Sequence, residues 1–158
     1  MMPTYVFLFV FLIGVVAGLR SMTAPAVISW GAHQGWLLLT GSPLGFFAHP
    51  VTLILLTLFA LGELVADKLS FIPSRTTPGP LVIRLISGAV CGAALCIAGQ
   101  SAWLYGVLLG ALGAVVGSYG GYYYRRLVPA NNRTMQFLAA LLEDVVAVGG
   151  GFWIVSRF

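Results

Sequence analysis

Three acidic residues stand inside apolar stretches of this chain and are its clearest candidates for chemistry. Glu63 lies near the end of an apolar run over 51–66, and Glu143 and Asp144 lie within another over 135–155. A charge near the centre of a bilayer costs roughly 2.5–3.5 kcal/mol on insertion scales, so such side chains should face protein or water. They predict a proton or cation site, or a charged lining for a substrate cavity. The alternative is that these acids pair with basic residues and only hold the helices together.

Two short clusters combine arginine, hydroxyl and proline residues in a way that suits an anion. They are Arg20-Ser21-Met22-Thr23-Ala24-Pro25 and Pro73-Ser74-Arg75-Thr76-Thr77-Pro78. Pro25 fits the first turn of a new helix, which Thr23 or Ser21 should cap. The start of a helix carries free N–H groups and a partial positive charge, so phosphate, carboxylate or a lipid headgroup would suit it. Ordinary capping and headgroup contact is the alternative.

A second acidic residue shares a helical face with Glu63, because Asp67 lies four positions later. Asp67 and Lys68 close the apolar run at a depth where a charge can reach water, so an interface anchor is also possible for them. The candidate substrate- or ion-binding residues are therefore Arg20, Ser21, Thr23, Glu63, Asp67, Lys68, Ser74, Arg75, Thr76, Glu143 and Asp144.

Neither a metal site nor a catalytic set can be recognised in the chain. His33 and His49 are isolated, with no partner at the spacing of metal ligands. We therefore expect no metal and no cofactor. An enzyme is the less expected class, although scattered arginines and acids can serve membrane transferases.

The composition is that of an integral membrane protein. Of 158 residues, 59% are hydrophobic and 8% are charged, whereas soluble domains average about 45–50% and about 25%. So few charged groups cannot cover a water-exposed surface. The net charge of +4 comes from bases beside apolar runs, so they indicate membrane topology rather than nucleic-acid binding.

The apolar runs predict one α-helical membrane domain over 1–158. It is a compact bundle of five spans with a sixth element over 24–40, which contains His33, Gln34 and two glycines. That element is either a broken half-membrane helix or a sixth spanning helix. A proline-rich loop is expected over 69–80 and a tight turn over 99–101. The spans expected are 4–22, 51–68, 81–98, 102–124 and 135–156.

The positions of the bases predict the orientation of the bundle in a bacterial inner membrane. Loops 67–80 and 125–134 carry most of the bases and should be cytoplasmic. With five spans the N-terminus lies on the same side as these loops. With six spans it lies on the opposite side.

Glycine spacing predicts close helix contacts. Gly14/Gly18 and Gly113/Gly117 have the small-x-x-x-small pattern that lets helices approach closely. Each pair precedes a span that contains a glutamate, which suggests an inverted repeat as in some transporters. Packing within one chain is the simpler interpretation, and a homodimer through the glycine-rich faces is the alternative.

Three motifs resemble one family of bacterial membrane proteins. They are Gly18-Leu19-Arg20-Ser21, Glu63-Leu64-x-x-Asp67-Lys68 and Pro73-Ser74-Arg75-Thr76, and together they are similar to the pattern of domain of unknown function 4126. The resemblance covers most of the chain. It implies a compact multi-span protein, singles out the charged residues of these motifs, and implies no particular activity.

These features favour a small transporter or channel for an ion or anionic solute, with a charged cavity open to the cytoplasm. Glu63 or Glu143 would carry protons or cations, and Arg20 and Arg75 would hold an anionic group. An enzyme or binding protein for a phosphorylated lipid at the inner leaflet is one alternative. A non-catalytic membrane scaffold is the other.

Overall fold

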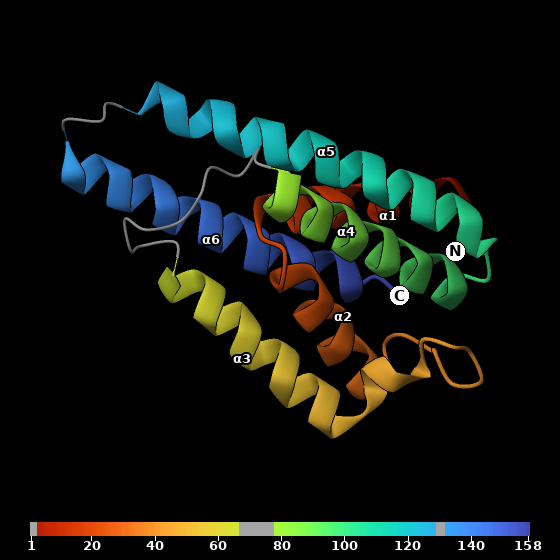
Figure 1. Ribbon diagram of the computed structural model, residues 1–158. Coiled ribbons are helices and arrows are strands. Elements are labelled where there is room, and N and C mark those ends of the chain that lie inside the picture. The colour runs from red at the N-terminus through yellow and green to blue at the C-terminus, as the bar shows by residue number, and fades with distance from the viewer. Residues whose placement is uncertain (1–2, 67–77, 129–131) are drawn as a thin grey trace.

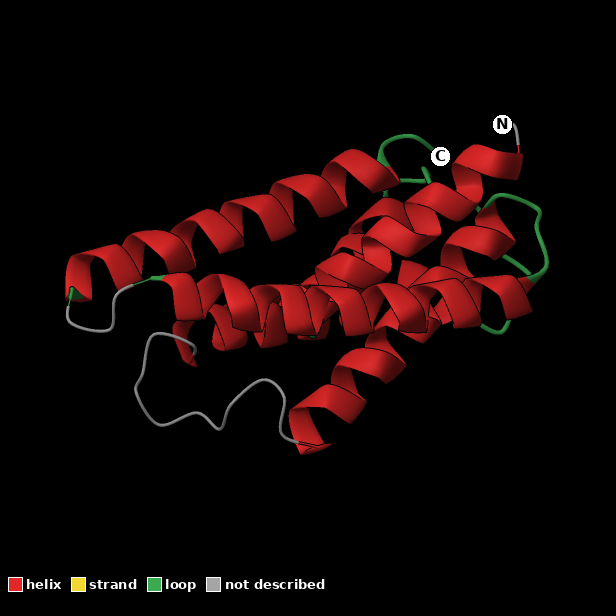
Figure 2. Ribbon diagram, turned by 90° about the horizontal axis from the view of Figure 1, so that it is seen from above, coloured by secondary structure: helices red, strands yellow, loops and turns green. Residues whose placement is uncertain are grey.

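The structure is a computed structural model that describes residues 3–66, 78–128 and 132–158. All regular structure in these ranges is helical (Figures 1 and 2). The elements are α1 (Pro3–Leu19), α2 (Thr23–His33), the 3₁₀ helix η1 (Gly45–Ala48), α3 (Pro50–Ala66), α4 (Pro78–Ala98), α5 (Trp103–Leu127) and α6 (Arg133–Val155).

Three helices, α4, α5 and α6, are long and apolar enough to cross a membrane. Helices α1 and α3 have 17 residues each, slightly fewer than the roughly 20 of a typical span. Helix α2 has 11 residues and covers only part of that thickness. The prediction of long apolar helices that could cross a membrane is thus confirmed for these three, and five full spans stay a prediction.

Some helix ends in the structure differ by a few residues from those expected from the sequence. Helix α4 begins at Pro78, so the last three positions of the loop expected over 69–80 are helical. Proline at the start of a helix loses no hydrogen bond, which explains the early start. The tight turn after α4 is confirmed, and Gln100 adopts a left-handed conformation there with φ of 54°.

Helices α1 and α2 form a hairpin that turns at 20–22 inside the bundle (Figure 1). Arg20 at the turn pairs with Asp144, which is the central residue of α6. Gly31 near the end of α2 lies against Val155 at the end of α6. The hairpin therefore enters from the end where α6 finishes and turns back about halfway along α6.

The two termini lie at the same end of the bundle (Figure 1). Phe9 in α1 contacts Trp153 and Phe158 through its ring, which places the start of α1 beside the end of α6. The last turns of α5 and α3 lie at the opposite end (Figure 1). The N-terminus thus lies opposite the ends of α3 and α5, as in the six-span alternative. In the five-span arrangement it would lie on the same side as the basic loops that follow these helices.

Glycines hold α1, α4 and α5 together. A Cβ at Gly14 would meet the carbonyl oxygen of Gly110, and one at Gly18 would meet that of Ala114. The residue numbers of α1 and α5 increase together along this contact, so the two helices run parallel. The inverted relation expected from the glycine pairs is therefore wrong. These faces pack within the chain, so a homodimer, which stays a prediction, would have to use another surface.

Helix α3 lies at the edge of the bundle, against α2 and η1 (Figure 1). Only Leu53 and Ala60 among its residues are buried. Its outer side exposes large apolar side chains such as Ile54 and Leu58. Such a surface is suited to lipid, and α3 reaches the polar centre of the protein only through its last turns.

Candidate functional site

Arg20 lies at the tip of the α1–α2 hairpin with no exposed surface. Its Nη2 forms an ion pair with Oδ1 of Asp144 on α6. Its Nη1 donates a hydrogen bond to the main-chain oxygen of Glu63 on α3, at 3.3 Å. A buried guanidinium needs such partners because apolar surroundings cannot solvate it. Arg20 thereby joins α3 and α6 at the tip.

The carboxylate of Glu63 binds the start of α2. It accepts hydrogen bonds from the main-chain N–H and the hydroxyl of Ser21, at 2.9 and 2.7 Å, and from the N–H of Met22 at 2.8 Å. These N–H groups have no partner within the helix and carry a partial positive charge. The expectation that Thr23 or Ser21 caps α2 is therefore wrong. Met22 is the N-cap residue without a side-chain bond, and Glu63 takes that role from another helix.

Polar side chains on α4 and α5 bind the carbonyl groups at the hairpin turn. Arg84 Nη1 and Ser118 Oγ donate to the carbonyl oxygen of Gly18, at 2.9 and 3.2 Å. Ser87 Oγ donates to that of Ser21, at 2.6 Å. The sequence reasoning did not select these three side chains. Their signal is the presence of small hydroxyls and a base inside apolar helices.

Thr23 is buried beside the tip, with 2% of its surface exposed. Its hydroxyl has no hydrogen-bond partner among the described residues. It lines a cavity of about 180 Å³ between α2, α3 and α6, which also touches Ala60 and Leu64 on either side of Glu63. A small open space with an unused hydroxyl thus lies beside the first turn of α2.

A family model matches residues 7–156 of the chain, under the description domain of unknown function (DUF4126). The chain belongs to the DUF4126 family. The resemblance seen in the sequence is thereby confirmed. Searches of curated proteins and of solved structures found no match.

Two of the motifs that resemble DUF4126 meet at one place in the fold. The segment 18–21 forms the hairpin tip, and Glu63 binds it through the contacts given above. Other predicted site residues, namely Asp67, Lys68, Ser74, Arg75 and Thr76, lie outside the described residues.

The second membrane glutamate of this DUF4126 protein has a different partner. Glu143 is 4% exposed and accepts a hydrogen bond from Arg125 Nε at 3.0 Å. Its neighbour Asp144 pairs with Arg20 instead. The two glutamates therefore bind different groups, and the link between their helices runs through Arg20.

Among the described residues, four charged side chains contact the hairpin tip of the DUF4126 protein. Arg20 and Arg84 are positive, and Glu63 and Asp144 are negative. No group of three or more possible metal ligands occurs within the described ranges. The anionic group on the donors at the start of α2 is the Glu63 carboxylate.

Proposed function

We propose that this DUF4126 protein transports a small monovalent anion, and that the tip of the α1–α2 hairpin is its binding site. The observation that carries the proposal is the seating of the Glu63 carboxylate on three donors at the start of α2. A break between two helices inside a membrane protein commonly places a helix N-terminus against an anionic substrate. Glu63 takes the place of that substrate.

Charge balance links the anion to a proton. With Glu63 ionised, its carboxylate occupies the donors at the start of α2, and a second anion has no place on them. Protonation of Glu63 removes its charge-assisted hydrogen bonds and removes one negative charge from the tip. A monovalent anion on the same N–H groups then replaces that charge. The anion and the proton therefore move together.

Other charged groups near the tip do not replace Glu63 in this exchange. Asp144 from α6 is held by Arg20, and Arg84 from α4 holds the end of α1. On the far side of Asp144, Glu143 is paired with Arg125. Glu63 is the half-buried carboxylate whose partners are N–H and O–H groups rather than a base.

Flux measurements on purified protein in liposomes test the proposal. We expect uptake of one or more of chloride, nitrate, formate and acetate to increase as the external pH falls. Glu63→Gln should stay folded and lose this pH dependence, because glutamine has no proton to exchange. Glu143→Gln is the matched control, since it removes the other membrane glutamate and should retain the dependence on pH.

A scaffold without transport is the second candidate, and the pairing of Arg20, Asp144, Glu143 and Arg125 within the chain favours it. In that case none of the four anions enters at any pH, and Glu63→Leu lowers thermal stability, because three donors at the start of α2 lose their acceptor. Either an absence of flux in the wild type or an unchanged pH dependence in Glu63→Gln would overturn the transport proposal.

A further inference from the structure

The cavity of about 180 Å³ beside Thr23 follows α2 from its first turn to its last. Helices α2 and α3 run in opposite directions along it. Ser21 before α2 binds Glu63, whereas Trp30 near the end of α2 donates from Nε1 to Thr57 Oγ1 at 3.1 Å. The cavity therefore extends about 10 Å along α2, at a rise of about 1.5 Å per residue. Both helices line it with one face, namely Thr23, Ala26, Val27 and Trp30 on α2, and Thr57, Ala60, Leu61 and Leu64 on α3.

The end of the cavity at the hairpin tip is polar. Thr23 is 2% exposed, and its hydroxyl has no hydrogen-bond partner among the described residues. A buried hydroxyl without a partner costs free energy, because it has lost its bonds to water. The preceding residue, Met22, is one of the donors to Glu63. The unused hydroxyl thus belongs to the residue next to the proposed anion site, and an oxygen of the anion would satisfy it.

The rest of the cavity is apolar. The Thr57 hydroxyl is already used, since it accepts from Trp30 and donates to the main-chain oxygen of Leu53 at 2.7 Å. The rings of Trp30 and Phe152, whose centroids are 6.5 Å apart, both line this part. Water in such surroundings would lack hydrogen-bond partners, whereas an alkyl group needs none. The cavity therefore suits a molecule that is polar at one end and apolar at the other.

The volume limits the size of this molecule. An engineered apolar cavity of about 150 Å³ binds benzene, a ring of six carbon atoms. A space of about 180 Å³ thus has room for an anion about as large as butyrate. Chloride or nitrate would use only the donors at the tip and leave the apolar part empty.

We propose that the anion bound at the hairpin tip is a short-chain monocarboxylate. Its carboxylate replaces that of Glu63 on the donors at the start of α2 and accepts a further hydrogen bond from the Thr23 hydroxyl. Its alkyl tail lies in the cavity between α2, α3 and α6. This inference rests on the anion site of the proposed function and names the class of substrate.

Binding of a series of sodium carboxylates tests the length of the tail. Affinity is measured from the rise in thermal stability of the purified protein in micelles at acidic pH, with sodium chloride at equal ionic strength as the reference. From acetate through propionate to butyrate we expect affinity to increase about fourfold for each added CH₂, the effect of its burial. Hexanoate should bind no better than butyrate, because its tail exceeds the cavity.

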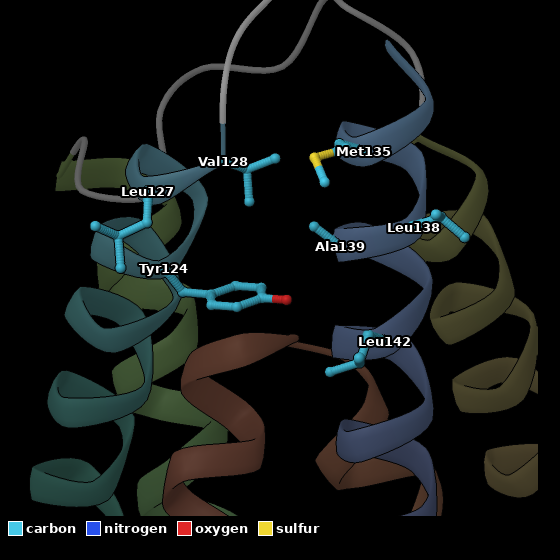
Figure 3. A pocket seen from close by; sticks show the side chains of 7 residues that line it. All are labelled: Tyr124, Leu127, Val128, Met135, Leu138, Ala139 and Leu142. Atoms are coloured by element: carbon cyan, nitrogen blue, oxygen red, sulfur yellow. The ribbon is translucent and has the colours of Figure 1, made fainter. Parts of the chain in front are cut away.

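A filled cavity should remove the effect of the tail. Ala60→Leu places three more carbon atoms in the cavity from α3, so butyrate should then bind no better than acetate. Ala139→Leu is the matched control. Ala139 is 8% exposed and Ala60 is 9% exposed, but Ala139 lines a different groove, between the ends of α5 and α6 (Figure 3). This control should retain the fourfold steps.

The hydroxyl is tested by Thr23→Val, which retains the shape of the side chain. All the carboxylates should bind about tenfold more weakly, the effect of one lost hydrogen bond to a charged group. Thermal stability without ligand should not fall, because the hydroxyl has no partner to lose. Thr57→Val is the control in the same cavity. It should lower thermal stability, since Trp30 loses its acceptor, and leave the affinity unchanged.

The results separate this inference from the transport proposal. Equal affinity for acetate, propionate and butyrate, or fourfold steps that persist in Ala60→Leu, would overturn the inference. Transport would still stand if chloride or nitrate uptake depended on pH. Binding that increases with the tail but is accompanied by no flux of any anion would overturn transport and support the site.

Discussion

Arg20 shows how one residue can determine the arrangement of several helices. Its guanidinium is wholly buried at the hairpin tip, so it must be neutralised by groups of the protein itself. Asp144 on α6 supplies the charge, and the main chain of α3 supplies a hydrogen-bond acceptor. The stability of the hairpin therefore depends on residues far from it in the sequence.

Removing one partner of this ion pair should cost far more than removing both. Arg20→Met leaves Asp144 buried without its charge partner, and we expect the free energy of unfolding to fall by about 3–5 kcal/mol. The double variant Arg20→Met, Asp144→Leu should recover most of this loss. Reversible unfolding in mixed detergent micelles measures both.

A double variant no more stable than Arg20→Met would show that the ion pair is not the cause of the loss. The cause would then be the lost hydrogen bond to Glu63 or the lost packing of the arginine stem.

The sequence indicated which residues matter at the tip better than it indicated their partners. Arg20 and Ser21 could be selected because they break an apolar run, and Glu63 and Asp144 because they interrupt others. The bond between Glu63 and the N–H groups of α2 depends on how two helices cross, which spacing does not determine. Arg84 is one of the bases beside apolar runs, which were interpreted together as signals of membrane topology.

At the scale of helices, glycine sets the distances. Gly110 lies at a crossing where α5 meets both α4 and α1, against Gly88 and Gly14. Main-chain atoms occupy the place of its missing side chain. Small residues are the usual means of bringing membrane helices this close, because they expose the backbone for packing.

A single methyl group at this crossing should separate the helices. For Gly110→Ala we expect the free energy of unfolding to fall by about 1–3 kcal/mol, because the neighbouring backbone has no room to move. Gly149→Ala should instead raise it by about 0.5–1 kcal/mol, since its Cβ would point into open space. Thermal unfolding in one detergent compares the two, and equal effects would contradict the assigned packing.

The small-x-x-x-small spacing correctly indicated close approach but not which helices approach one another. The sequence also left the 24–40 element open between a broken half-membrane helix and a sixth spanning helix. The structure combines both, with a short α2 that returns toward the end where α1 begins. Tertiary pairing through Arg20 decides this, and a local pattern cannot show it.

For the whole molecule, the main result is that both termini lie at the same end of the bundle. The turn between α4 and α5 lies there too, because Val6 of α1 would meet a Cβ at Gly99. The ends of α5 and α3 lie opposite. The bases then predict that the opposite end, with Arg125 and Arg126, faces the cytoplasm.

Labelling of single cysteines in intact cells tests this topology. The native Cys91 and Cys96 are buried and need not be removed. A membrane-impermeant maleimide should label Tyr5→Cys and Ala102→Cys from outside. Asn132→Cys should react only after permeabilisation. Labelling of Tyr5→Cys on the same side as Asn132→Cys would support the five-span arrangement instead.

The order of the chain also has a consequence for how the protein is made. Helix α1 leaves the ribosome before α5 and α6, yet Arg20 directly follows its last residue, and its glycine face fits α5. Both α5 and Asp144 are synthesised much later. During translation Arg20 therefore has no Asp144 to pair with. The hairpin must stay beside the insertion machinery or near water until α6 is made, so it can take its final place only after the last helix is present.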